Sequence, residues 1–445
     1  MNDTIAAIAT PLADGAISII RISGEDAISI VNTLFDKDLE KCSANTITYG
    51  YISDPTTGET VDEVLVSLFR NPKSFTAEDV VEINCHGGRY VTKTVLTMLL
   101  SAGARLARPG EFTQRAFLHG RIDLTQAEAV LDLIEANDKT KARMAVNGIR
   151  GSVAKLLEPL ISELLDMIAN IEVNIDYPEY DDVEQIRNEI LLPKVNDWLA
   201  RINEIIKKAE SGAIIKEGIQ TAIIGKPNVG KSSLLNALLE EEKAIVTDVE
   251  GTTRDIVEGS IRLEGVTLHL IDTAGIRDSE DAIEQIGMEK SKAAMERAQL
   301  ILLVLDGGKP LGENDEKLLE MTKDKERLIV YNKSDLMKEH ADQDGIYISA
   351  KNQDIEELLQ ALVQKYEQHT AVIDEPLLNN ERQIGLIHMA RRHMENAQKA
   401  LQEDIQIDLV EIDMQAAYQS LKEILGEYHR DDLLDTLFSN FCLGK

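Results

Sequence analysis

Residues 221–239 read TAIIGKPNVGKSSLLNALL and decide the fold of the central part of this 445-residue chain. A short apolar run comes first, followed by Gly225-x4-Gly230-Lys231-Ser232 and then by apolar residues at helical spacing. Glycines in such a loop let backbone N–H groups turn toward a phosphate, and the N-terminus of the following helix adds its positive dipole. The stretch therefore predicts a strand, a phosphate-binding loop and a helix of the P-loop type.

The residues around this loop have distinct expected roles. Lys231 would reach the β- and γ-phosphates of a nucleotide, and the Ser232 hydroxyl would ligate Mg²⁺. Residues 247–255, TDVEGTTRD, lie between the loop and the next motif, where the first switch segment of such a protein belongs. Thr253 is the expected Mg²⁺-coordinating hydroxyl of that segment.

Three later motifs follow in the order that a guanine-nucleotide switch requires. Residues 266–275, VTLHLIDTAG, end with Asp272, which can hold Mg²⁺ through water, and with Gly275, whose N–H can contact the γ-phosphate. Asp335 closes the motif NKSD, and its carboxylate can accept from guanine N1–H and the 2-amino group, which adenine does not offer in that arrangement. Residues 349–351, SAK, suit backbone donation to guanine O6. Together these motifs predict GTP rather than ATP.

The position after Gly275 is informative because a common catalytic residue is missing there. Many GTPases place a glutamine at this point to orient the attacking water, whereas this chain has Ile276. Acidic residues in 277–287, RDSEDAIEQIG, are candidates for that task. The Asn228 side-chain oxygen, with switch hydroxyls and carbonyls, would suit a hard monovalent cation that supplies positive charge beside the phosphates.

The composition limits the environment of the protein. With 47 Lys+Arg against 78 Asp+Glu, the formal net charge is −31, so a whole-surface attraction to nucleic acid or anionic lipid is not expected. The three cysteines are widely spaced and predict neither a disulfide framework nor a clustered zinc site. We expect no secretory signal and no membrane helix, and hence a cytoplasmic protein.

The pattern of apolar residues divides the chain into four segments. Residues 1–120 alternate short strands with turns and predict an α+β module, and helical periodicity begins at about residue 121 and continues to 215. Residues 216–372 alternate strands and helices, and helices return in 373–445. We infer an α/β domain of the Ras-like P-loop type, inserted into a helical domain whose two halves pack together. Two independent helical regions are the alternative.

Several motifs resemble those of one family, the MnmE (or TrmE) tRNA uridine modification GTPases. They are DTIAAIATP (3–11), FTAEDVVEINCHGG (75–88), ARPGEFTQRAFLHGRIDLTQAEAVLDLIEA (107–136), GKPNVGKSSLLNALL (225–239), IVTDVEGTTRD (245–255), IDTAGIR (271–277), NKSDL (332–336) and FCLGK (441–445). The resemblance spans residues 3–445. It implies an N-terminal tetrahydrofolate-binding domain, a helical domain in two segments and an inserted G domain.

The resemblance also implies an activity and its partners. The protein would be a homodimer, through the N-terminal domain, with potassium-stimulated GTP hydrolysis. With an FAD-containing partner, MnmG (or GidA), it would modify C5 of the wobble uridine of certain tRNAs. The cofactors implied are GTP, Mg²⁺, K⁺ and 5-formyl-tetrahydrofolate or a related tetrahydrofolate.

Matching of motifs transfers the family's site residues to this chain. Mg²⁺ would take Ser232 and Thr253, K⁺ would take Asn228, Thr247, Val249 and Thr252, Glu284 would position the attacking water, and folate would contact Arg21, Glu82, Arg121 and Lys445. The GTP-binding set is Asn228, Val229, Gly230, Lys231, Ser232, Ser233, Thr247, Asp248, Val249, Glu250, Gly251, Thr252, Thr253, Asp272, Thr273, Ala274, Gly275, Asn332, Lys333, Asp335, Ser349, Ala350 and Lys351.

Three other interpretations stay open from the sequence. A regulatory or ribosome-assembly GTPase would use residues 1–120 to bind a partner and carry out no modification. Cys442, fourth from the end, has the position of a prenylated cysteine, but Lys445 and the acidic DDLLD upstream do not fit such an anchor. Cys85 and His86 are adjacent on a predicted strand, so they face opposite sides and are poorly placed to act as nucleophile and base.

Overall fold

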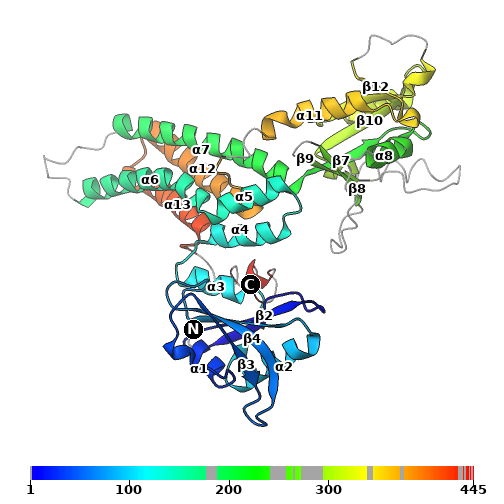
Figure 1. Cartoon of the computed structure of the whole chain (residues 1–445). Coiled ribbons are helices and arrows are strands. Elements are labelled where there is room, and N and C mark those ends of the chain that lie inside the picture. Colours follow the sequence, from blue (N-terminus) through cyan, green and yellow to red (C-terminus); the bar gives the residue numbers. More distant parts are fainter. Residues whose placement is uncertain are drawn as a thin grey trace. The chain divides into compact units, whose positions relative to one another are not determined.

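The computed structural model describes most of the chain (Figure 1). The described residues are 3–176, 188–240, 257–263, 266–271, 294–337, 344–370, 375–428, 434, 437–439, 441 and 444. They form two compact units, one from Met1–Asn196 with Met389–Lys445 and the other from Asp197–His388. Each unit contains one six-stranded sheet.

The first unit begins with a sheet module, whose strand order is β3-β4-β5-β2-β1-β6. Neighbouring strands are antiparallel except for the parallel pair β1–β6. The strands are β1 (Ile5–Ile8), β2 (Ile17–Ser23), β3 (Thr46–Ser53), β4 (Thr60–Phe69), β5 (Val80–His86) and β6 (Arg105–Leu106), and the helices are α1 (Ala27–Asn32), η1 (Leu39–Lys41), α2 (Arg89–Ser101) and α3 (Glu111–Leu118).

The two faces of this sheet differ. Strand β4 alternates between buried Val64, Val66 and Leu68 and more exposed residues between them. The buried face forms one apolar cluster with α1 and α2. Apolar side chains are exposed elsewhere on these strands, at Ile17, Ile47, Tyr49, Tyr51 and Leu65. One face of the sheet is therefore the core of the module. The other face is buried against Phe112 at β1 and is exposed along β3 and β4.

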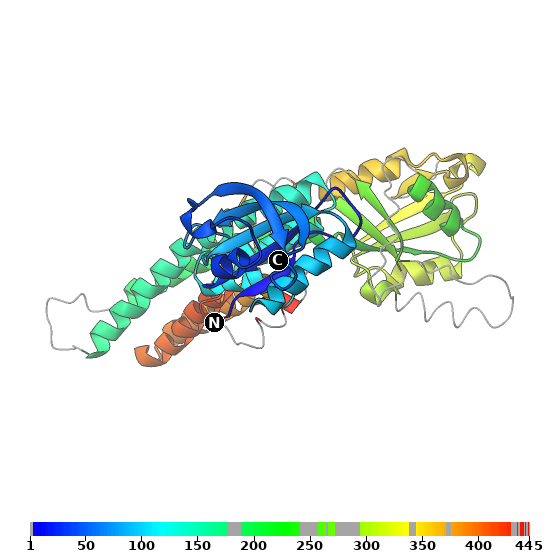
Figure 2. The same cartoon turned by 60° about the horizontal axis from the view of Figure 1, so that its bottom comes forward.

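The helical part of the first unit joins segments far apart in sequence. Its helices are α4 (Leu124–Glu135), α5 (Lys139–Ile149), α6 (Ser152–Asp176), the start of α7 (Asn188–Glu217), the end of α12 (Glu381–Gln402) and α13 (Ile407–Leu425). Helix α6 packs along α13, as Figures 1 and 2 show, and Gln398 donates to Asn196 over 2.6 Å. The two halves therefore pack together, which confirms the insertion and excludes independent helical regions.

The second unit has the predicted alternation of strands and helices. Its sheet order is β12-β11-β10-β7-β9-β8, in which β8 and β9 are antiparallel and the other pairs are parallel. The elements are β7 (Ile219–Ile224), α8 (Lys231–Glu240), β8 (Val257–Leu263), β9 (Val266–Ile271), β10 (Leu300–Asp306), α10 (Glu313–Met321), β11 (Arg327–Asn332), η2 (Ser334–Leu336), β12 (Ile346–Ile348), η3 (Ala350–Asn352) and α11 (Glu356–Thr370). The fold is multidomain, with an α+β module, a helical domain and an inserted Ras-like α/β domain.

Candidate functional site

The P-loop follows the central strand of the second sheet. Strand β7 ends at Ile224, and α8 begins at Lys231. The Lys231 ammonium donates to the carbonyls of Gly225 and Lys226 over 2.8 and 2.9 Å, so it lies across the loop. Ser232 is exposed in the first turn of α8, where the helix dipole favours anions. The geometry is that of a phosphate-binding loop.

Asn332, at the end of β11, joins three loops of this site. Its side-chain nitrogen donates to the Val229 carbonyl over 2.9 Å, and its oxygen accepts from the N–H groups of Ala350 and Lys333 over 3.0 and 2.8 Å. Gly230 makes this approach possible, because a Cβ there would lie 2.1 Å from the Asn332 nitrogen and its φ is +99°. The sequence motifs therefore converge in space.

Lys333, the residue after Asn332, also contacts the P-loop. Its ammonium donates to the Asn228 carbonyl over 2.7 Å and to the Asp306 carboxylate over 2.8 Å. Burial of the Asp306 carboxyl opposes its ionisation, but bonds from Lys333 and the Gly308 N–H outweigh that effect and hold its pKa below the ordinary value. Sequence reasoning missed Asp306, whose signal is a lone carboxylate that closes the apolar strand LILLVLD.

The guanine-selecting motifs meet at the adjacent loops. The Ser349 hydroxyl donates to one oxygen of Asp335 over 2.7 Å and so orients that carboxylate. The Ala350 N–H already donates to Asn332, which leaves the Lys351 N–H as the amide of this motif with no partner among the described residues. The contact of residues 349–351 with guanine O6 stays a prediction.

Part of the predicted nucleotide site lies outside the described residues. This holds for the first switch, for the residues after β9 and for the expected water-positioning carboxylate, and those assignments stay predictions. The residues are Thr247, Asp248, Val249, Glu250, Gly251, Thr252, Thr253, Asp272, Thr273, Ala274, Gly275 and Glu284.

A second cluster lies on the sheet module and contains three of the four predicted folate contacts. Arg21 of β2 stands opposite Glu82 of β5 in the strand register. The Arg21 Nε and terminal nitrogen each lie 2.8 Å from the same Glu82 oxygen, and both side chains are about four-fifths buried. The other Glu82 oxygen has no partner among the described residues, so it can still accept hydrogen bonds from a ligand.

Two cations share one aromatic ring in this cluster. The guanidinium carbons of Arg21 and Arg121 lie 5.6 and 4.7 Å from the centre of the Phe75 ring. Desolvation lowers the pKa of Arg121, although the side chain is exposed and stays charged at neutral pH. Within the described chain Arg121 has no carboxylate partner. An anionic ligand would supply one.

The last residues of the chain reach this cluster. The Gly444 carbonyl accepts from Arg21 over 3.1 Å. A Cβ on Gly444 would lie 2.5 Å from the Ile8 carbonyl, and the φ of this glycine is +91°. Lys445 itself lies outside the described residues, as does Cys442, but its neighbour is already at the predicted pocket.

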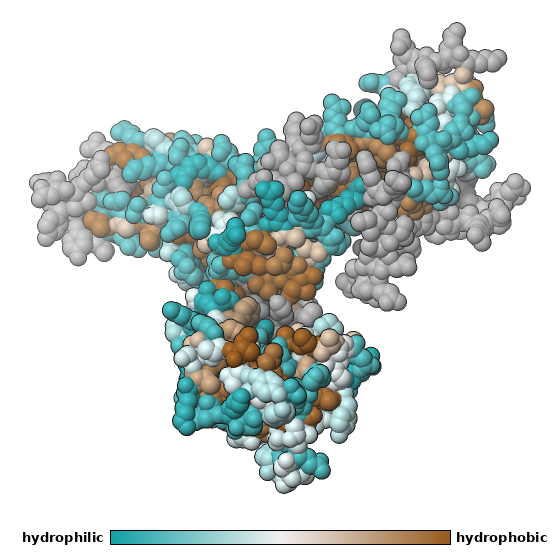
Figure 3. All heavy atoms as spheres, viewed as in Figure 1, coloured by the Kyte–Doolittle hydropathy of each residue, from teal (hydrophilic) through white to brown (hydrophobic). Residues whose placement is uncertain are grey.

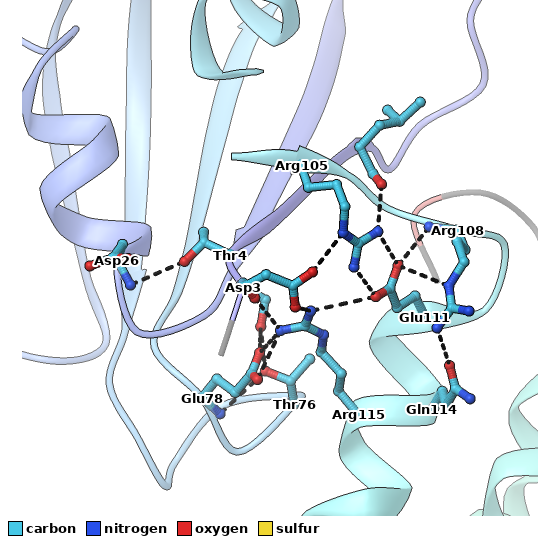
Figure 4. A network of polar contacts seen from close by, with 12 residues as sticks. Asp3, Thr4, Asp26, Thr76, Glu78, Arg105, Arg108, Glu111, Gln114 and Arg115 are labelled. Carbon is cyan, nitrogen blue, oxygen red and sulfur yellow. Dashed lines mark hydrogen bonds and ion pairs between the residues drawn. The ribbon is translucent and has the colours of Figure 1, made fainter. Parts of the chain in front are cut away.

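A buried ion network fixes α3 (Figure 4). Arg115 is fully buried and donates to Asp3 over 2.7 Å and to Glu78 over 3.0 Å. Glu111 is also fully buried and accepts from Arg105, which with the Arg108 N–H lowers the Glu111 pKa against the opposing effect of burial. Breaking such a buried network by removing one partner leaves an uncompensated charge. The network therefore holds the helix that leads to Arg121.

Cys85 and His86 face opposite sides of β5, as the sequence predicts. Burial raises the pKa of the Cys85 thiol to about 12, so it is no nucleophile at neutral pH. The exposed His86 ring instead contacts Asp62 over 2.6 Å. Over the described ranges there is no group of three or more His, Cys, Asp and Glu side chains placed to hold a metal ion. Nor does any helix in those ranges have the length and apolar character needed to cross a membrane.

Comparisons with known proteins identify the family of the chain. Residues 4–121 match the family profile described as "GTP-binding protein TrmE N-terminus", and residues 124–442 match "MnmE helical domain". The tRNA modification GTPase MnmE of Lactobacillus delbrueckii subsp. bulgaricus is 48% identical over 456 residues, which cover 100% of this chain and 98% of that protein. That of Streptococcus thermophilus is 48% identical over 451 residues, with the same coverage.

Among solved structures, the G domain of the FeoB iron transporter of T. maritima is 26% identical, with 34% of this chain and 99% of that chain covered and a TM-score of 0.26.

The family profiles together span most of the sequence, and the relatives align with its whole length. The chain belongs to the MnmE family of tRNA modification GTPases.

Proposed function

We propose that this GTPase is stimulated by potassium and, with an FAD-containing partner of the MnmG type, uses a folate one-carbon unit to modify C5 of the wobble uridine of tRNA. The product would carry an aminomethyl or carboxymethylaminomethyl group. One observation supports this proposal most. The same chain carries a converged guanine-nucleotide site and a second cluster of charged side chains. In that cluster one oxygen of Glu82 accepts from Arg21, and the exposed guanidinium of Arg121 lies over the Phe75 ring.

The described residues of the P-loop fit GTP with Mg²⁺. Lys231 would neutralise the β- and γ-phosphates, and Asp335 would read the guanine edge. The Ser232 hydroxyl makes no hydrogen bond within the described chain, so it is available to Mg²⁺, with Thr253 as the second ligand. The metal would draw charge from the transferring phosphate and so favour hydrolysis.

The described part of the potassium site also fits. Asn228 has a φ of +64° and its side chain is exposed, and its amide oxygen accepts no hydrogen bond from the described residues. Thr247, Val249 and Thr252 would complete the ligands. When bound, such a cation supplies positive charge near the phosphates. Equal hydrolysis rates in K⁺ and Na⁺ at fixed ionic strength would contradict this part of the proposal.

Glu284 would position the attacking water. Many GTPases use a glutamine for this task, but this chain has Ile276 at that position. A Glu284→Ala variant should lose most of the hydrolysis rate and keep nearly all of its GTP affinity. If its turnover matches the wild type, another group performs this task.

The second pocket fits a reduced folate by its donor set. A pterin presents adjacent N–H groups that suit the open Glu82 oxygen, and the glutamate tail presents carboxylates that suit Arg121 and Lys445. Arg21 would orient Glu82 through the contacts already described. The bound folate would supply the one-carbon unit of the reaction.

The proposed partners need exposed surface, and the described residues offer it. The sheet face that carries Ile47, Tyr49 and Leu65 suits a homodimer through the N-terminal module. On the helical domain, brown spheres gather over α4 in Figure 3, where Leu133 and Ile134 are exposed. These surfaces support assembly into a heterotetramer with the FAD protein. The acidic chain would contact tRNA in the cytoplasm through a local patch or through that partner.

A folate titration of the full-length protein tests the proposal. Calorimetry with 5-formyl-tetrahydrofolate should show binding to the wild type and a loss of about tenfold or more in a Glu82→Gln variant. Arg89→Gln, which changes an exposed arginine of α2, is the matched control and should bind normally. GTP hydrolysis without any folate binding by the wild type would favour the regulatory-switch alternative.

A further inference from the structure

We infer that Asp315, on α10, is a positioning residue of the phosphate site and acts through the second residue of the P-loop, Lys226. This inference rests on the proposed nucleotide site and adds to it Lys226, a P-loop position with no assigned role, and Asp315, which no motif contains. Lys226 and Asp315 form an ion pair between the loop and the first turn of α10. The Asp315 side chain is 9% exposed and that of Lys226 28% exposed, so the pair is screened from water.

The pair acts on the atom that holds the phosphate-binding lysine. The carbonyl of Lys226 accepts from the Lys231 ammonium over 2.9 Å, next to the Gly225 carbonyl at 2.8 Å. Fixing the Lys226 side chain to α10 therefore limits the rotation of the peptide group that receives Lys231. The opposite end of the loop is fixed separately, because Lys333 and Asn332 donate to the carbonyls of Asn228 and Val229. Without the Asp315 contact, no side chain of α10 would fix Lys226.

Asp315 has a second contact, which the test must keep intact. Its Oδ2 also accepts from the Gly312 N–H over 2.9 Å and so caps α10. An Asp315→Asn substitution retains an amide oxygen that can accept from Gly312, while it removes the charge that pairs with Lys226. The variant therefore separates the ion pair from the helix cap.

The experiment is a comparison of GDP with GMP on the full-length chain. A fluorescent GDP gives the dissociation constant for the diphosphate, and its displacement gives the constant for GMP, which lacks the β-phosphate that Lys231 would contact. We expect Asp315→Asn to weaken the binding of GDP about tenfold and the binding of GMP by less than about twofold. This is the pattern expected when a charged contact is lost only at the phosphate end of the nucleotide.

Two further variants complete the test. Lys226→Met keeps the aliphatic stem and should match Asp315→Asn, and the double variant should be no worse than either single one. Glu313→Gln removes an exposed carboxylate from the same helical turn and should bind GDP normally. Equal weakening of GDP and GMP, additive losses in the double variant, or unchanged GDP binding would each overturn the inference. A wild type that binds no GDP would instead contradict the proposed nucleotide site.

Discussion

His86 shows how one neighbour sets the charge of a surface residue. The ring Nδ1 of His86 lies 2.6 Å from one Asp62 oxygen, and the backbone N–H of His86 donates to the other oxygen over 2.8 Å. The bond and the charge of Asp62 raise the pKa of His86 above the ordinary 6.5. The protonated ring therefore stabilises the pairing of β4 with β5.

This contact has a testable dependence on pH. The stabilisation is complete below the unfolded pKa of 6.5 and is lost as the pH rises through the higher pKa of the folded protein. NMR titration of the imidazole signals should give a raised pKa for His86 and a value near 6.5 in an Asp62→Asn variant. An identical His86 pKa in both proteins would show that Asp62 is not the cause.

At the residue scale, the sequence predicted the placement of a side chain correctly where a single structural rule determines it. Strand alternation predicts that Cys85 and His86 face apart, and a charge within an apolar strand predicts a partner for Arg21. It could not find Asp306 or Asp315, because their partners come from loops that only the folded sheet brings together. A lone carboxylate in sequence has no distinguishing pattern.

Helices and strands were predictable from the sequence where the periodic spacing of apolar residues extends over enough residues. Strands β2 to β5 and helices α2, α6 and α7 match segments of clear alternation or helical spacing. Strand β1 is only four residues and is buried without alternation. Helix α3 buries four polar or charged side chains, of which Glu111 and Arg115 belong to the ion network. Neither has the pattern of its class. The domain bounds at residues 120, 215 and 372 stay predictions.

Helix α4 begins with a capping box that can be tested at its own scale. Asp123 accepts from the Gln126 N–H over 2.8 Å, and the Gln126 side chain accepts from the Asp123 N–H over 3.0 Å. Asp123→Ala should cost about 1 kcal/mol locally, so that hydrogen exchange of the first-turn amides of α4 becomes about fivefold faster. Asp123→Asn retains a capping oxygen and should change exchange little. Equal acceleration in both variants would contradict a capping role.

At the scale of the whole molecule, the P-loop and guanine motifs predict a Ras-like domain because their order along the chain is fixed by that fold. The contact between Arg21 and Gly444 could not be predicted in this way, because no periodicity connects residues so far apart in sequence. Only the family resemblance indicated it. Long-range pairing is therefore the information that single-sequence patterns lack.

Gly444→Ala tests this long-range contact. The substitution would place a Cβ 2.5 Å from the Ile8 carbonyl at a φ of +91°, so the last residues must leave their position. We expect folate affinity to fall by about tenfold or more while the basal rate of GTP hydrolysis stays unchanged. Gly385→Ala, on α12 with open space around it, is the control. Normal folate binding by Gly444→Ala would show that these residues do not form the pocket.

The same contact orders events during synthesis of the protein. Arg21 and Gly444 are separated by 423 positions, which a ribosome needs roughly 20–85 s to translate at about 5–20 residues per second. During that time the sheet module and the inserted GTPase domain can fold, but the proposed folate site lacks the residues at the end of the chain. A chain that is cut or released early would keep its P-loop and lack a complete pocket. Folate binding would therefore distinguish finished chains from truncated ones.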